Sequence, residues 1–285
     1  MSVINTNVKS LVAQNAMTVN NRSMDKAMQQ LSTGKRINSA ADDAAGLAIS
    51  NKMTAQIRGL NQAVRNANDG ISMLQTAEGA TQEITNMLQR MRELAVQAAN
   101  GTYQGSDRSA LNAEVESLSA EITRIADNTE WNGMKLFTAG NAASGTGIGS
   151  AGVVTLQVGI GGSAGDRFTV TLTDIDAAAL GVSAGAISLS TRSGATLALS
   201  ALDDAIETID AERSTYGATM NRLTYAMDNL TNISQNAQAS RSRIMDTDYA
   251  QATTELARSQ IIQQAATAML AQANQAPQTV LSLLR

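Results

Sequence analysis

The chain has 285 residues, a formal net charge of −4 and a pI near 5.0, and it contains no cysteine and no histidine. Disulfides, Cys/His metal sites, Ser-His-Asp triads and HExxH protease motifs are therefore excluded. Aromatic residues make up only 2% and there is no basic run, which argues against a nucleic-acid-binding protein. No segment approaches the roughly 18 apolar residues of a membrane span. Residues 1–16 do not resemble a signal peptide, so a cytoplasmic protein, or one exported by another route, is expected.

The first predicted element is a helix that ends near Gly34 and is followed by a polar connector at 33–50. A much longer helix is predicted from about 44 to 100, and Ser106 or Asp107 could cap a third helix. Apolar residues three and four apart, the spacing of helices that lie along one another, run through all three. These residues are Val8, Leu11, Val12, Ala16, Val19, Met24, Ala27, Met28 and Leu31; then Ile57, Leu60, Val64, Ala67, Ile71, Leu74, Ala77, Ala80, Ile84, Met87, Met91, Leu94 and Ala98; then Leu111, Val115, Leu118, Ile122 and Ile125.

Two hairpins are predicted after the third helix. Asn132-Gly133 lies between apolar residues and is a strong signal for a tight turn. Residues 153–160 and 167–175 alternate in polarity and are rich in β-branched side chains. They are therefore predicted to be strands that flank a turn at 161–166.

Two further helices are predicted on either side of a polar connector at 240–250. The first begins near Ser200, and only Arg213 and Ser234 interrupt its apolar stripe. The second contains Pro277, the sole proline, where a kink but no helix end is expected because the stripe keeps its phase. The two stripes are Leu202, Ile206, Ile209, Arg213, Tyr216, Met220, Leu223, Met227, Leu230, Ser234 and Ala237; and Ile262, Ala266, Met269, Ala273, Ala276, Val280 and Leu283.

These elements predict a mainly α protein, a long antiparallel coiled-coil-like helix bundle with a small β-hairpin region inserted mid-chain. The simplest arrangement pairs the two long helices and packs the tail against residues 4–31. The expected domains are a terminal helical pair (1–38 and 243–285), a long-helix bundle (39–139 and 197–242) and its β-hairpin part (140–196). Thin Ala-rich helices bury little surface, so further copies of the chain are expected to cover them, and a head-to-tail contact that does not close gives a filament.

Catalytic and binding chemistry is only weakly indicated. Gly159, Gly161 and Ala164 match a G-x-G-x-x-A pattern, but a dinucleotide site needs a helix to follow and a strand is predicted there. Adjacent carboxylates favour solvated or helix-start positions, with Asp203 expected in a first helical turn. These carboxylate pairs are Asp42 and Asp43, Asp203 and Asp204, and Asp246 and Asp248.

The charged residues Arg90, Arg92 and Glu93 are expected on the exposed side of the long helix, where charges usually serve solubility. No catalytic residue, metal ligand or cofactor is assigned, and an enzyme is not expected.

Several segments together resemble bacterial flagellin, in the family's order and over nearly the whole chain. They are VINTN (3–7), GKRINSAADDAAGLAIS (34–50), QRMRELAVQAANGT (89–102), TEWNGMKLF (129–137), LQVG (156–159) and APQTVLSLLR (276–285). The resemblance implies a near-minimal flagellin in which the outer variable domain is absent or vestigial. It implies a structural subunit that polymerises into the bacterial flagellar filament for swimming motility, is secreted by the flagellar type III route and resides outside the cell.

The resemblance also implies partners: other copies of the chain in a helical homopolymer, hook-associated and cap proteins, a flagellar secretion chaperone and host Toll-like receptor 5. The positions that match the receptor-binding segment are Gln89, Arg90, Glu93, Leu94, Gln97 and Glu114. Leu281, Leu283 and Leu284 match a segment that intracellular flagellin sensors recognise. Polymerisation through the terminal helices would use Val8, Leu11, Val12, Ala16, Val19, Met28, Leu31, Ile262, Ala266, Met269, Ala273, Val280, Leu281, Leu283 and Leu284.

Three other functions remain open at this point. A hook–filament junction protein shares terminal helices with flagellin but would not polymerise without limit. An enzyme on a helical scaffold would need a pocket that titrates near neutral pH. A cytoplasmic coiled-coil adaptor would have ordered terminal helices as a free monomer, whereas termini that pair only with neighbours order on assembly.

Overall fold

The computed structural model describes residues 7–137 and 152–282, with side chains through residue 275. The chain forms two compact units, one from residues up to 57 and from 235 onward, the other from residues 58–234. Both boundaries fall inside long helices, α2 (Ala44–Ala99) and α4 (Arg192–Met245).

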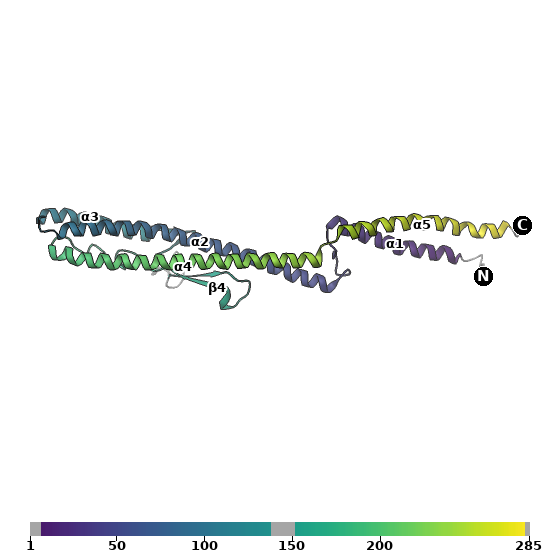
Figure 1. Ribbon diagram of the computed structural model, residues 1–285, viewed down its shortest axis with the longest axis horizontal. Coiled ribbons are helices and arrows are strands. Elements are labelled where there is room, and N and C mark those ends of the chain that lie inside the picture. Colours follow the sequence, from purple (N-terminus) through teal and green to yellow (C-terminus); the bar gives the residue numbers. More distant parts are fainter. Residues whose placement is uncertain (1–6, 138–151, 283–285) are drawn as a thin grey trace. The chain divides into compact units, whose positions relative to one another are not determined.

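In the first unit, α1 (Val8–Thr33) and α5 (Tyr249–Ser282) lie side by side, as Figure 1 shows. The pairing of the tail with the N-terminal helix is therefore confirmed. Gly34 ends α1 with a left-handed backbone (φ 67°), and its N–H donates to the Gln30 carbonyl at 2.9 Å, which is the expected helix stop. α5 continues past position 277, so the proline does not end it.

In the second unit, α2 and α4 run antiparallel, which three contacts along their length establish. Asn61 pairs with Ser234, Glu78 with Arg213, and Arg92 with Asp203. The third helix, α3 (Gly105–Asn128), packs on them, and the apolar stripes predicted for all three helices are buried or half-buried. The mainly α bundle is thus confirmed.

Two predicted helix starts are wrong. α4 begins at Arg192 rather than near Ser200, so Asp203 lies about three turns inside the helix instead of in its first turn. The N-cap of α3 is Gln104, and Asp107 acts from the first turn, where its carboxylate accepts the Gln104 N–H at 3.0 Å.

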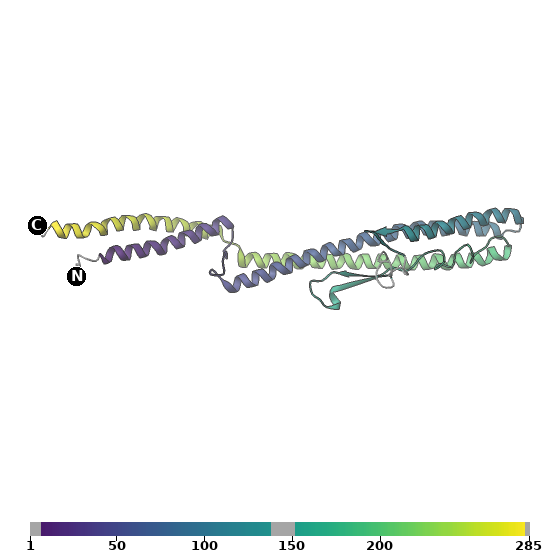
Figure 2. The ribbon, with the colours of Figure 1, turned by 180° about the vertical axis from the view of Figure 1, so that it is seen from behind.

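Both hairpins form as predicted. Strands β1 (Glu130–Trp131) and β2 (Met134–Lys135) are joined by Asn132-Gly133, whose φ angles of 51° and 76° are the two left-handed positions of a tight hairpin turn. The remaining pair is seen from behind in Figure 2 and comprises β3 (Val153–Gln157) and β4 (Arg167–Thr171).

The β3–β4 hairpin packs on the helix bundle, with Val170 in the core and Leu156 and Phe168 against it. The Asn66 amide of α2 donates to the Gln157 carbonyl at 2.9 Å. The connection ends in a short 3₁₀ turn, η3 (Ala164–Asp166), and then β4 begins. Because a strand follows, Gly159, Gly161 and Ala164 belong to a hairpin connection and the dinucleotide-binding interpretation is excluded.

Tyr216 of α4 is fully buried in the bundle core, and its hydroxyl has no hydrogen-bond partner among the described residues. Burial, with Glu212 nearby, raises the pKa of Tyr216. We expect Tyr216→Phe to stabilise the monomer by about 1 kcal/mol, because it removes an unpaired buried polar group. Urea unfolding followed by circular dichroism measures the difference. A clear loss of stability would mean that the hydroxyl is hydrogen-bonded in solution.

Candidate functional site

The contact between α1 and α5 is most deeply buried at small and polar side chains. On α1 the buried residues are Asn20 and Ala27, and on α5 they are Ala252 and Ser259. The half-buried residues around them continue the same three-four spacing: Ser10, Ala13, Met17, Met24 and Leu31 on α1, and Leu256, Gln263, Ala266, Leu270 and Ala273 on α5. Such a seam lets the two helices approach closely but buries little apolar surface.

Two asparagines hold this seam together. The Asn20 amide donates to the Ser259 carbonyl at 2.8 Å in a buried position, and the Asn7 amide donates to the Ala273 carbonyl at 2.8 Å. Asn7 also caps α1, because its side-chain oxygen accepts the Ser10 N–H at 3.2 Å. Sequence analysis missed both residues, although a polar side chain at the heptad position of Asn20 is a known signal for fixed register.

The predicted seam of the tail is partly wrong. Ala266 and Ala273 do face α1, but Ile262 and Met269 point outward and are 45% and 66% exposed. The stripe that faces α1 shares Ala266 and Ala273 with the predicted stripe but has Gln263 and Leu270 in place of Ile262 and Met269. The apolar spacing alone did not distinguish the two. The stripe that faces α1 is the one with small residues and the carbonyls that accept the asparagine amides.

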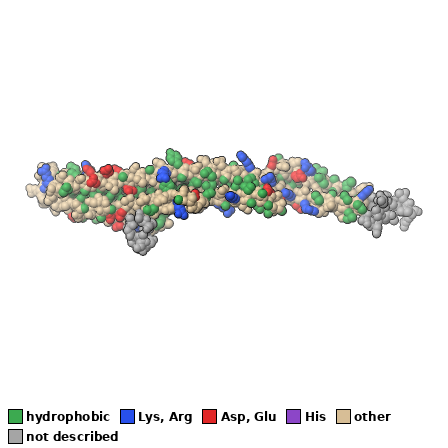
Figure 3. Space-filling view, turned by 90° about the horizontal axis from the view of Figure 1, so that it is seen from below, with side chains coloured by type: hydrophobic (Ala, Val, Ile, Leu, Met, Phe, Trp, Pro, Cys, Tyr) green, Lys and Arg blue, Asp and Glu red, His purple; other side chains and the backbone are tan. Residues whose placement is uncertain are grey.

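Several large apolar side chains of both terminal helices point outward, although others, such as Met24 and Leu270, are half-buried in the seam. Val12 is 65% exposed, and Val8, Leu11, Val19 and Met28 are likewise more than half exposed. Figure 3 shows hydrophobic side chains on the surface of this helix pair, interspersed with Lys and Arg. Isolated exposed apolar residues are ordinary, but a continuous exposed stripe marks an interaction surface.

This stripe borders a groove between the two helices, which we call the α1–α5 groove. Its first section has a volume of about 480 Å³ and its second about 540 Å³. Val12 lines both sections, so they lie along the same side of α1. The wall residues Val12, Val19, Ile262 and Met269 repeat at intervals of seven on each helix, which is the spacing at which another helix could lie along the pair.

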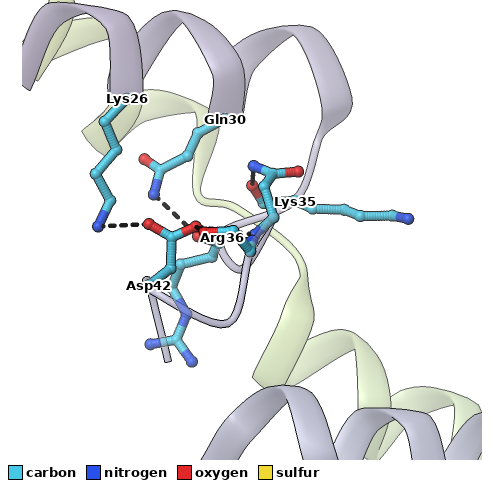
Figure 4. A network of polar contacts seen from close by, with 7 residues as sticks. Lys26, Gln30, Lys35, Arg36 and Asp42 are labelled. Carbon is cyan, nitrogen blue, oxygen red and sulfur yellow. Dashed lines mark hydrogen bonds and ion pairs between the residues drawn. The ribbon is translucent and has the colours of Figure 1, made fainter. Parts of the chain in front are cut away.

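The two connectors of the first unit are linked to each other. The Arg36 N–H donates to the Met245 carbonyl at 2.7 Å, and its guanidinium donates to the Ile244 carbonyl at 2.7 Å. Figure 4 shows the polar network on the α1 side, where Lys26 lies 2.9 Å from Asp42 and the Gln30 amide donates to the Arg36 carbonyl. Asp42 lies two residues before α2 and is paired with Lys26, where a solvated or helix-start carboxylate was expected.

Asp42 should make the first unit sensitive to acid. The Lys26 ammonium, then the Ser39 and Asn38 N–H groups, lower its pKa from 3.8 to about 2. A lowered pKa stabilises the fold above the unfolded value, and this contribution is lost as the pH falls from about 4 to 2. We expect Asp42→Asn to cost about 1 kcal/mol at pH 7, a value reduced by the exposure of Lys26, and to flatten the stability profile over that range.

Unfolding of the full chain by urea, repeated between pH 2 and pH 7, tests this expectation. Asp25→Asn supplies the control, because Asp25 is an exposed carboxylate on α1, the helix that carries Lys26. If both variants kept the native pH profile, the Lys26–Asp42 pair would contribute nothing to stability.

A second candidate surface lies on α2 and α3. Gln89, Arg90, Glu93 and Gln97 are exposed on α2, and Glu114 is exposed on α3. The Arg90 guanidinium lies 3.0 Å from Glu93 and 2.9 Å from Glu114, and these hydrogen bonds raise the pKa of Arg90. The two ion pairs bring one positive and two negative groups together on this surface.

Leu94 does not belong to this surface. Its side chain is 1% exposed and packs in the bundle core, because its position falls on the buried stripe of α2. The expectation that it contacts a receptor directly is therefore corrected. Nearby, Arg92 is paired with Asp203 at 2.6 Å, which lowers the pKa of the Asp203 carboxyl.

Other predicted site residues carry less structural information. Leu31 is half-buried in the seam and Ala16 is exposed beside the groove. Val280 and Leu281 lie in α5, but their side chains are outside the described residues, as are Leu283 and Leu284 entirely. Within the described ranges, no group of three or more acidic residues could hold a metal ion, and no helix is long and apolar enough to cross a membrane.

Comparisons with known proteins agree with this architecture. The model of the bacterial flagellin N-terminal helical region matches residues 4–142, and that of the C-terminal helical region matches residues 199–284. A flagellin of Halalkalibacterium halodurans is 46% identical over 283 residues, which cover 99% of this chain and 100% of the relative. The flagellar filament 33 kDa core protein of Treponema phagedenis is 44% identical over 287 residues, with coverage of 99% and 100%. The crystal structure of Bacillus cereus flagellin is 34% identical with a TM-score of 0.50, covering 58% of this chain and 88% of that one.

The paired terminal helices and these matches show that the chain is a structural protein of a bacterial filament. More particularly, the chain belongs to the bacterial flagellin family. It is a small member, since the described residues between α3 and α4 form hairpins and turns without a large outer domain. Membership implies a structural role, self-association and a place in the extracellular flagellar filament.

Proposed function

We propose that the chain is the repeating subunit of a flagellar filament for swimming motility, and that subunits join through the outward stripes of α1 and α5. One observation carries this proposal: the most deeply buried residues of the α1–α5 seam are small or polar, while an apolar stripe on each terminal helix stays exposed. Burying such side chains contributes about 25 cal/mol per Å² of apolar surface removed from water. In a free monomer these side chains remain in water, and contact with neighbouring copies would bury them.

The groove is suited to a helix from another copy of the chain. Val12 and Val19 on one wall and Ile262 and Met269 on the other provide apolar contacts at heptad intervals. The helices that form the groove cannot also occupy it. Each subunit would therefore bind a helix of one neighbour in its groove and place a helix in the groove of the next. A heterologous contact of this kind continues as an open helical polymer when the rotation does not close.

The wider role follows from the proposed polymer. Residues 1–38 and 243–285 would form the inner tube, and residues 39–139 and 197–242 with the β-hairpin part at 140–196 would surround it. Export would take the flagellar type III route, with a secretion chaperone covering the apolar tail beforehand. Cap and hook-associated proteins would contact the two ends of the filament. Leu281, Leu283 and Leu284 remain the proposed segment for intracellular sensors.

A seeded growth assay tests the proposed function. Full-length monomer is mixed with short filament fragments, and growth is followed by light scattering and electron microscopy. Long filaments whose length increases with monomer supply are expected. Growth that stops after a short zone would favour the hook–filament junction protein, and a monomer that never adds to seeds would favour the coiled-coil adaptor.

We also propose that host Toll-like receptor 5 recognises the exposed face of α2 and α3. The support is geometric: Gln89, Arg90, Glu93 and Gln97 lie exposed on one side of α2, and Glu114 joins them through its ion pair with Arg90. Arginine is frequent among interface hot spots. The Arg90 guanidinium pairs with two carboxylates and still has further N–H donors for a partner.

Arg90→Ala should weaken receptor activation by monomeric protein about tenfold or more, since central arginines are frequent hot spots in interfaces. Reporter cells that carry the receptor provide the measurement. Arg124→Ala is the matched control, because Arg124 is an exposed arginine on α3 that pairs with Glu121 and lies outside the proposed surface. Equal responses to both variants would remove this face from the proposal.

A further inference from the structure

We propose that Met269 is an oxidation-sensitive site, and that conversion of its thioether to the sulfoxide by a hydroperoxide blocks entry of the subunit into the filament. The inference rests on the proposed polymer. It concerns the free subunit, before assembly covers the α1–α5 groove.

The Met269 thioether is accessible to an oxidant in solution. The chain has 13 methionines and no cysteine, so no thiol competes for an oxidant. Met269 is 66% exposed, whereas Met73 and Met91 are 1% and 0% exposed inside the bundle core. Reactivity of a thioether toward peroxide follows its exposure, so Met269 should react well before the two buried residues.

Met269 also lies in the wall of the α1–α5 groove. Met269 forms one wall of the second section of the groove, together with Val8 and Val12 on the facing helix. Met28 is also exposed, but it does not line either section of the groove. Among the described residues, Met28 and Met269 are the two exposed methionines, and of this pair only Met269 lies where an incoming helix would pack.

The reaction is balanced without any further reagent. A sulfur lone pair of Met269 attacks one oxygen of hydrogen peroxide, so that an S–O bond forms as the O–O bond breaks. The sulfur loses two electrons and becomes a sulfoxide, and the departing hydroxide takes up the remaining peroxide proton to give water. Methionine sulfoxide reductases reverse the change.

The effect on assembly follows from polarity. The sulfoxide oxygen is a strong hydrogen-bond acceptor, whereas the thioether is nearly apolar. The groove section around Met269 contains four aliphatic side chains and two donors, Lys9 and Gln272. Packing a neighbour there would remove water from a strongly polar group where an apolar one had been, which opposes association. We therefore expect oxidation to raise the monomer concentration needed for growth about tenfold.

The experiment treats full-length monomer with dilute hydrogen peroxide, removes the oxidant and measures seeded growth against the same protein untreated. Peptide mass spectrometry follows oxidation at Met269, Met28, Met73 and Met91. Growth of the native chain should fall as Met269 is oxidised and return after incubation with the two sulfoxide reductases. Peroxide should not reduce the growth of Met269→Leu relative to its own untreated sample, whereas Met28→Leu should respond as the native chain does.

The outcomes separate this inference from the proposed function. If the untreated native chain fails to extend seeds, the proposed polymer and the inference fall together. If it extends them equally well after full oxidation of Met269, only the inference is overturned. The same holds if Met269→Leu loses as much growth on oxidation as the native chain, because the sensitive group would then lie elsewhere.

Discussion

Replacing Val12 by aspartate should abolish or severely slow filament growth while leaving the monomer folded. Val12 is 65% exposed in the monomer, so the carboxylate stays in water before assembly and costs the fold little. In the filament the same side chain would be buried in both sections of the groove. We expect the monomer concentration needed for growth to rise about tenfold or more, because an unpaired buried charge costs well over 1.4 kcal/mol.

The control for Val12→Asp adds the same charge to the same helix away from the groove. Gln14 is exposed on α1 and lines neither section, so Gln14→Asp should affect growth much less. Circular dichroism checks that both variant monomers have the same helix content as the native monomer. Normal growth of Val12→Asp alongside the native chain would show that the groove is not the assembly surface.

Replacing Leu94 by alanine should destabilise the monomer by about 2–5 kcal/mol, the usual range for a leucine removed from a packed core. Leu94 is 1% exposed and belongs to the core that α2 shares with α3 and α4. Alanine leaves a cavity there that the long helices cannot easily close. Urea unfolding of the monomer, followed by circular dichroism, measures the loss.

Leu197 provides the matched control, because it is a leucine on α4 that is 74% exposed. Leu197→Ala should change the free energy of unfolding by less than about 0.5 kcal/mol. A small effect at Leu94 would mean that its side chain is not packed in solution and could still be offered to a receptor. A large effect means that any loss of receptor signal in this variant reflects the fold.

The fold could be predicted from the sequence because the heptad stripes of the long helices are continuous. Leu202, Tyr216 and Leu223 illustrate this, since each was expected to lie on one stripe and each is fully buried. The start of α4 was harder to predict, because residues 191–194 are rich in Ser, Thr and Gly and resemble a loop. In fact the Thr191 hydroxyl accepts the Gly194 N–H at 3.1 Å and caps the helix early.

The candidate assembly surface was only partly predictable. The sequence identified apolar stripes on the terminal helices but not the direction in which each stripe faces. That direction depends on Asn20 and Asn7, whose acceptors on α5 lie 239 and 266 residues away in the chain. The Lys26–Asp42 pair was missed for a similar reason, because it depends on how the connector folds back onto α1.

The two asparagine bonds of the α1–α5 seam have a consequence for mutational tolerance. Each donor is a side chain on α1, but each acceptor is a main-chain carbonyl on α5. A substitution at position 259 or 273 that keeps the helix and the close packing leaves the acceptor in place. A substitution at Asn7 or Asn20 removes the donor itself. The two helices should therefore accept changes unequally, with α5 free to vary its small side chains and α1 restricted to asparagine at two positions.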